Sequence, residues 1–87
     1  MVNQKIIINN PSGLHLRPAG NLCNEAMKYQ SAITFEFEGG TANAKSVLSV
    51  LGACVKCCDE IELICDGADE QEAMKALTDA ISGGLGE

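Results

Sequence analysis

The sequence has few aromatic and few basic residues. Only 3% of its 87 residues are aromatic, none is tryptophan, and six lysines and arginines face twelve aspartates and glutamates, for a formal charge of −6. A surface with this excess of negative charge repels a nucleic-acid backbone or an anionic membrane rather than releasing counterions from it. We therefore expect no nucleic-acid partner and no membrane partner.

Long apolar runs are also missing. No stretch approaches the roughly 18–20 apolar residues of a membrane span, and Met1–Lys5 lacks the apolar run of a signal peptide. The five cysteines are an odd number in a chain without such a signal, which argues against a disulfide framework. We expect a cytoplasmic protein with reduced thiols that folds as a single domain over residues 1–87.

Hydrophobic periodicity divides the chain into seven short elements. Residues that alternate between apolar and polar, or form short β-branched runs, predict strands at 2–8, 33–38, 41–44 and 61–65. Apolar residues at helical spacing predict a helix from Leu16 to about Lys28 or Tyr29, a short helix over 47–51, and a last helix between Asp69 and Gly83. The order is β-α-β-β-α-β-α.

Local signals support the starts of two of these helices. Ser46 is a natural N-cap for the short helix, and Asp69 followed by Glu72 resembles a capping box. Three helices that are each apolar on one side pack most economically on one face of an antiparallel sheet. The pattern therefore predicts an α+β fold with a four-stranded antiparallel sheet and three helices on one face.

The only histidine, His15, lies between a glycine turn and the start of the first helix. At about pH 7 an imidazole is substantially neutral, so a ring nitrogen can attack phosphorus without a separate base. The phosphoryl group would then lie at a helix N-terminus, which favours anions, and Arg17 could fork onto its oxygens. The alternative is that His15 is only a capping or surface residue.

The segment Gly13-Leu14-His15-Leu16-Arg17-Pro18-Ala19 resembles the phosphohistidine signature of the HPr family, the phosphocarriers of the bacterial phosphoenolpyruvate-dependent sugar phosphotransferase system. Lys45-Ser46 resembles the regulatory serine site of that family, and the tail Gly84–Glu87 is also similar. The resemblance implies an open-faced β-sandwich and no cofactor. It further implies that His15 accepts phosphate from Enzyme I and passes it to sugar-specific IIA proteins, so that partner enzymes turn the carrier over.

Ser46 raises a second possible function, which is regulatory. In Gram-positive members of the family, a dedicated HPr kinase/phosphorylase phosphorylates the serine at this position. The chain could therefore act mainly as a regulatory module that engages a catabolite control regulator through phospho-Ser46. Related regulators of that kind lack the histidine, so the presence of His15 favours the carrier.

A docking surface is expected on the first two helices. Val47, Leu48 and Leu51 cannot all face inward from so short a helix, which indicates an exposed apolar patch, with core packing as the alternative. The resemblance favours docking of partner proteins at this patch, together with Leu16 and Gly20 of the first helix. Leu16 departs from the small residue that the family usually has there. Nothing in the pattern demands self-association, so we expect a monomer.

Cys54, Cys57 and Cys58 form a CxxC motif with an adjacent third cysteine. This motif raises the alternative of a thiol-based metal or redox protein. A structural zinc site needs four ligands, and buried cysteines commonly act as small hydrophobic residues, so we expect no metal site. Family members often have small residues, frequently glycine, at positions like 54 and 58, and the cysteines are a departure from that pattern.

Overall fold

The computed structural model describes residues 1–86, which form an alternating series of strands and helices. The elements are β1 (Val2–Ile7), α1 (Leu16–Ala26), β2 (Ala32–Phe37), β3 (Gly40–Asn43), α2 (Val47–Gly52), β4 (Glu60–Asp66) and α3 (Glu70–Ser82). The predicted order β-α-β-β-α-β-α is confirmed. Glu87 lies outside the described residues.

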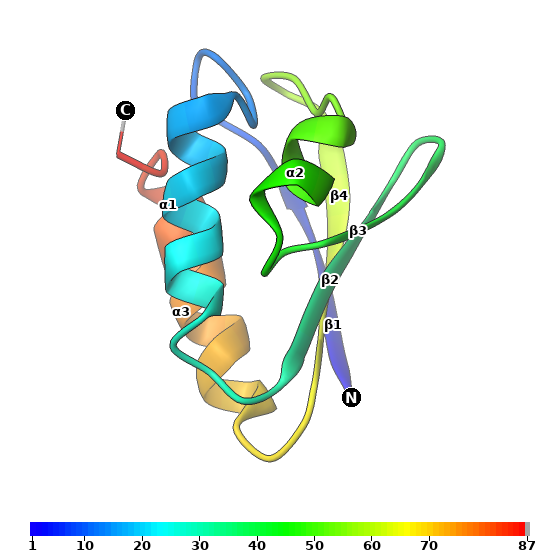
Figure 1. The fold of residues 1–87 in the computed structure, drawn as a ribbon, viewed down its shortest axis with the longest axis vertical. Helices are drawn as coiled ribbons and strands as arrows, with labels where there is room; N and C mark the ends of the chain where they lie inside the picture. The colour runs from blue at the N-terminus through cyan, green and yellow to red at the C-terminus, as the bar shows by residue number, and fades with distance from the viewer. Residues whose placement is uncertain (87) are drawn as a thin grey trace.

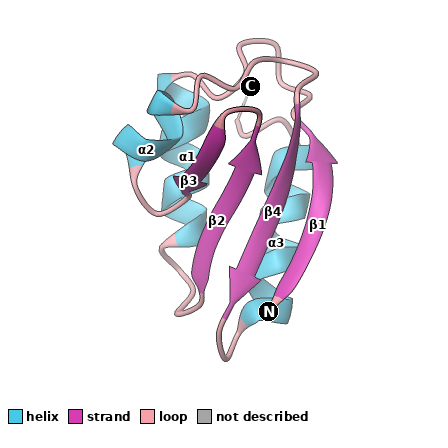
Figure 2. Ribbon diagram, turned by 90° about the vertical axis from the view of Figure 1, so that its right-hand side faces the viewer, coloured by secondary structure: helices cyan, strands magenta, loops and turns pink. Residues whose placement is uncertain are grey.

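The strands form one antiparallel sheet in the order β1-β4-β2-β3 (Figure 2). Alternation sets its two faces, because Ile33, Phe35 and Leu63 are buried on one face while Glu36 points to solvent on the other. All three helices cover the buried face (Figures 1 and 2). The predicted α+β architecture, an open-faced sandwich, is therefore confirmed.

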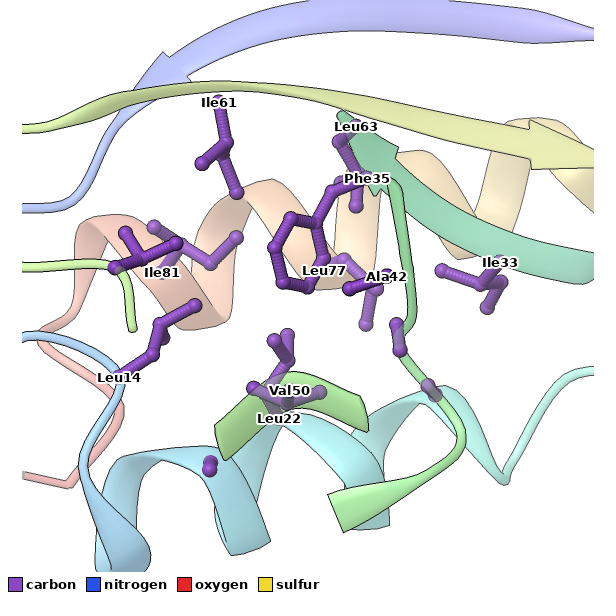
Figure 3. Packing of buried hydrophobic residues seen from close by; sticks show 14 of the residues in the cluster. Leu14, Leu22, Ile33, Phe35, Ala42, Val50, Ile61, Leu63, Leu77 and Ile81 are labelled. Atoms are coloured by element: carbon purple, nitrogen blue, oxygen red, sulfur yellow. The ribbon is translucent and has the colours of Figure 1, made fainter. Parts of the chain in front are cut away.

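The core lies between the sheet and the helices (Figure 3). Phe35 from β2 is fully buried and lies in one cluster with Leu22 of α1, Val50 of α2 and Leu77 of α3. The helices α1 and α3 each contribute an apolar stripe to this space, as the periodicity predicts, whereas the short α2 buries only Val50. The packing fixes α1 and α2 against the same sheet and so fixes the segments that precede and follow them.

The first helix ends slightly earlier than the sequence predicts. Its last residue is Ala26, and the chain continues in a tighter turn in which the amides of Lys28 and Tyr29 donate to the carbonyls of Glu25 and Ala26, each at 3.2 Å. Bonds that reach back three residues often follow the end of an α-helix. The apolar spacing alone does not distinguish this turn from a further turn of helix.

The capping box predicted for α3 is wrong. Asp69 is the N-cap residue, but its carboxylate accepts no hydrogen bond from the helix. It accepts instead from the amides of Gln30 and Ser31 at 2.8 and 2.9 Å, and from the Ser31 hydroxyl. These bonds lower the pKa of Asp69, with the Ser31 hydroxyl as the largest cause. Asp69 therefore ties α3 to the loop before β2.

Within residues 1–86, no helix is long and apolar enough to cross a membrane.

Candidate functional site

His15 occupies the N-cap position of α1 with an exposed side chain. Its backbone is extended, with φ −78° and ψ −174°, and its carbonyl accepts the first intrahelical bond, from Ala19 at 2.8 Å. An N-cap residue commonly uses its side chain to bond the helix amides, but the imidazole of His15 makes no such bond. The ring is therefore not held by a capping bond and is open to solvent. That His15 reacts, rather than being only a residue at the helix start or on the surface, stays a prediction.

The loop before His15 is held against the segment that follows α2. Gly13 has φ +66°, and a Cβ atom there would come within 2.5 Å of the Val55 carbonyl oxygen. The amide of Leu14 donates to that same oxygen at 2.9 Å, and the Leu14 side chain is buried. Figure 1 shows the two segments side by side at one end of the molecule. The position of His15 is thus set by a contact between two distant parts of the chain.

A pocket of about 340 Å³ opens beside the imidazole. It is lined by His15, Ser12 and Leu14 from one segment and by Leu51, Cys54, Val55 and Lys56 from the other. Lys56 brings a positive charge to the pocket, which suits a phosphoryl group next to the ring. Sequence reasoning missed Lys56 and the placement of Cys54 here, because only the tertiary contact between the two segments brings them to His15.

Arg17 lies in the first turn of α1, exposed, and does not line this pocket. It forms no ion pair with a carboxylate in the described part of the chain. The amides at the start of α1 have no partner inside the helix, because Ala19 makes the first backbone bond. An anion at the start of α1 is therefore favoured by these free amides and by the guanidinium of Arg17, two residues from His15.

Ser46 caps α2, as predicted. Its hydroxyl oxygen accepts from the amide of Ser49 at 3.2 Å, and the side chain is half-buried. Neighbouring Lys45 is held to the loop after α1, since its Nζ donates to the Tyr29 carbonyl at 2.7 Å. Ser46 does not line the His15 pocket, and Leu51 near the other end of α2 does.

The apolar residues predicted for docking are exposed to different degrees. Leu48 is 82% exposed and Leu16 is 64% exposed, whereas Val47 and Leu51 are half-buried. A Cβ atom on Gly20 would meet nothing within 4 Å, so this position is open surface. Because α1 and α2 pack against each other, these residues belong to adjacent helices. Core packing does not account for Leu16 or Leu48.

The turn after α2 contains three free cysteines. Cys54 and Cys58 are exposed and Cys57 is intermediate, so their interpretation as small buried hydrophobic residues is wrong. Cys54 has φ 54° and Cys58 has φ 76°, a backbone conformation that favours glycine. No cluster of three metal-ligating side chains occurs within residues 1–86.

Comparison with known proteins identifies the family. The family described as the PTS HPr component phosphorylation site matches residues 2–82. The HPr-like protein Crh of Bacillus subtilis (strain 168) is 38% identical over 77 residues, which cover 88% of this chain and 91% of Crh.

Two solved structures from Thermoanaerobacter tengcongensis are also similar, each 38% identical in sequence. HPr-C-His superposes with a TM-score of 0.95 over 100% of this chain and 98% of that one. An HPr dimer superposes with a TM-score of 0.79 over 100% of both chains. These similarities agree with the sheet, its three helices and the exposed histidine at the start of α1. The chain therefore belongs to the HPr family of phosphocarrier proteins.

Proposed function

We propose that the chain is a phosphoryl carrier of the sugar phosphotransferase system that is phosphorylated on His15. The observation that carries this proposal is the exposed imidazole at the start of α1, which makes no capping bond. A ring nitrogen of His15 attacks the phosphorus on Enzyme I, the bond between phosphorus and Enzyme I breaks, and a phosphohistidine forms. The same group then passes to a IIA protein, so the carrier is regenerated and is not itself an enzyme.

Charge around the ring supports this chemistry. Lys56 lines the His15 pocket and Arg17 lies two residues from His15 in the first turn of α1, so both cations are placed near His15 by the pocket or by the chain. Their charge offsets the negative charge that the group brings to an acidic protein. The exposed Leu16 and Leu48 provide apolar area for partner docking beside that position. We place the carrier in the cytoplasm, where phosphoenolpyruvate and Enzyme I are present, and propose that it acts as a monomer.

The test is phosphoryl transfer from phosphoenolpyruvate in the presence of Enzyme I from the same host. We expect one acid-labile phosphate per chain in the native protein and none in His15→Ala. Arg17→Lys keeps the charge but loses the bidentate fork, so it should transfer more slowly than the native chain and faster than Arg17→Ala. Label that persists in His15→Ala contradicts the assignment.

A second candidate function is regulatory, and the 38% identity to Crh favours it. Phosphorylation of Ser46 adds about −1.5 to −2 charge at the N-terminus of α2, where the helix dipole tolerates it and a docking partner meets it. The partners would be HPr kinase/phosphorylase and a catabolite control regulator. Incubation with the kinase and ATP should give an acid-stable phosphate that is lost in Ser46→Ala and kept in Ser49→Ala. Without such label, the regulatory function fails and the carrier function is unaffected.

A further inference from the structure

The turn between α2 and β4 contains three thiols, and one of them, Cys54, lines the pocket beside His15. The Sγ atoms of the adjacent Cys57 and Cys58 lie 3.3 Å apart. Cys58 is exposed and Cys57 is partly exposed, so small molecules reach the pair from solvent. The proposed phosphoryl transfer uses none of these thiols, and the turn adopts a backbone conformation that would suit glycine better.

We propose that Cys57 and Cys58 form a reversible dithiol site that low-molecular-weight disulfides such as glutathione disulfide oxidise to an intramolecular disulfide, and that this oxidation slows phosphorylation at His15. The effect on phosphorylation rests on the proposed function, whereas the oxidation itself does not. The site is independent of Cys54, which shares the pocket with His15 but need not take part in the bond.

The chemistry proceeds in two exchange steps. The Cys58 thiolate attacks one sulfur of glutathione disulfide, whose S–S bond breaks and releases a glutathione thiolate. Cys57 then loses its proton and attacks the Cys58 sulfur, which releases the second glutathione thiolate. Two electrons pass from the two cysteines to glutathione disulfide, and the two cysteine protons end on the two glutathione thiols.

The contacts of the pair assign these roles. A hydrogen bond with Cys58 is the largest cause that raises the pKa of Cys57, followed by burial and then by the negative charges of Cys58 and Asp59. Cys58 is the more exposed of the two thiols, so we assign it as the first nucleophile, and the raised pKa of Cys57 suits the second step. Consecutive Cα atoms are about 3.8 Å apart, shorter than the roughly 4.4–6.8 Å of ordinary disulfides, so the bond is strained and readily reduced. Reversibility follows from that strain.

Backbone hydrogen bonds connect the pair to His15. The amide of Cys58 donates to the Ile8 carbonyl at 2.6 Å, and the amide of Leu14 donates to the Val55 carbonyl at 2.9 Å. The turn thus holds both ends of the segment that leads to His15. A disulfide must bring the two Sγ atoms from 3.3 Å to about 2.05 Å. Because consecutive Cα atoms lie closer than the Cα atoms of ordinary disulfides, we expect this bond to distort the backbone of the turn. A displacement near 1 Å at a reacting group can cost about 100-fold in rate.

The experiment equilibrates the full chain with glutathione disulfide, records its mass, and then measures phosphorylation by Enzyme I and phosphoenolpyruvate. We expect the native chain to lose two hydrogen atoms, to be phosphorylated about 10- to 100-fold more slowly, and to recover with dithiothreitol. Cys57→Ser and Cys58→Gly should show neither change, while Cys54→Ser should still lose two hydrogen atoms. Glycine suits the φ of 76° at position 58, so folding of that variant is secure.

The outcomes distinguish the dithiol site itself from its effect on phosphorylation at His15. A stable glutathione adduct, a disulfide between two chains or an unchanged mass overturns the dithiol site, whatever the rate of phosphorylation. An intramolecular Cys57–Cys58 disulfide with an unchanged rate overturns the connection to His15. Failure of the reduced native chain to accept phosphate refutes the proposed function and the connection with it, and the mass still decides the dithiol site.

Discussion

Replacement of Gly13 by alanine should destabilise the protein strongly, because Gly13 lies in the loop before His15 and has no room for a methyl group. The residue has φ +66°, and the left-handed conformation costs an alanine about 1–2 kcal/mol. The new Cβ would also lie 2.5 Å from the Val55 carbonyl oxygen and 2.7 Å from the Lys56 Cα. Both are backbone atoms that cannot rotate away, and such overpacking costs about 1–3 kcal/mol. The free energy of unfolding should therefore fall by about 2–5 kcal/mol.

That loss is large for a chain of this size. At about 0.05–0.15 kcal/mol per residue, the whole protein is stable by roughly 4–13 kcal/mol. The melting temperature should fall by roughly 8–40 °C, because each kcal/mol is equivalent to about 4–8 °C in a domain of this length. Urea unfolding followed by far-ultraviolet circular dichroism measures the change without tryptophan, which the chain lacks.

Gly20→Ala is the matched control. It also adds one methyl group, but within α1 and with nothing inside 4 Å, so it should stabilise the protein by about 0.5–1 kcal/mol. The free energy of unfolding of Gly13→Ala could instead lie within about 1 kcal/mol of the native value. In that case the contact with the turn after α2 does not constrain the loop before His15, and the reasoning fails.

Three further predictions test other parts of the molecule. Leu48→Ser should change stability by less than about 0.5 kcal/mol, because Leu48 is 82% exposed. It should raise the KM of Enzyme I for this chain by about 5- to 30-fold, whereas Ile7→Ser, an exposed position in β1, should leave that KM unchanged. Equal KM values for all three chains would exclude docking at α2. The pKa of Asp69 in the folded protein lies below its ordinary value of 3.8. Its carboxylate therefore contributes stability above pH 3.8, and this contribution is lost as the pH falls through the pKa of the folded state. Asp69→Asn should therefore be less stable near pH 6 and nearly equal to the native chain in strong acid, and parallel acid-unfolding curves would contradict this. Cys54→Gly should gain about 1 kcal/mol by relief of its φ of 54°, while Cys57→Gly should lose about 0.5–1 kcal/mol, both measured by thermal unfolding.

Periodicity predicts the elements of this fold well, because each strand and helix buries one face and so carries its own signal. The alternation at Ile33 and Phe35, the N-cap Ser46 and the glycines after α3 are local features that act within a few residues. The end of α1 and the role of Asp69 are different. Asp69 has the residue type of a cap, yet a distant loop offers it three donors, and tertiary contact outweighs the local preference.

The candidate site follows from the sequence only in its local part. His15 and Arg17 are separated by one residue, so their common helix start is predictable. Lys56 and Cys54 reach the same pocket through the contact between the loop before α1 and the turn after α2. A periodic pattern contains no information on which two loops meet. Cys54 and Cys58 have a left-handed backbone, which glycine adopts without strain. This conformation explains why glycine is frequent at these positions in the family that the sequence resembles, and why cysteine there is a departure.

The order β1-β4-β2-β3 also bears on how the protein folds as it is synthesised. β1 is paired on only one side, with β4, through partners such as Val2 with Cys65. β1 therefore has no strand to bind until β4 has been synthesised, and contacts of such long sequence separation slow folding. Until then the apolar face of the β2–β3 hairpin and of α1 must be shielded in some other way. The protein should therefore complete its sheet only after β4 has been synthesised and can pair with both β1 and β2.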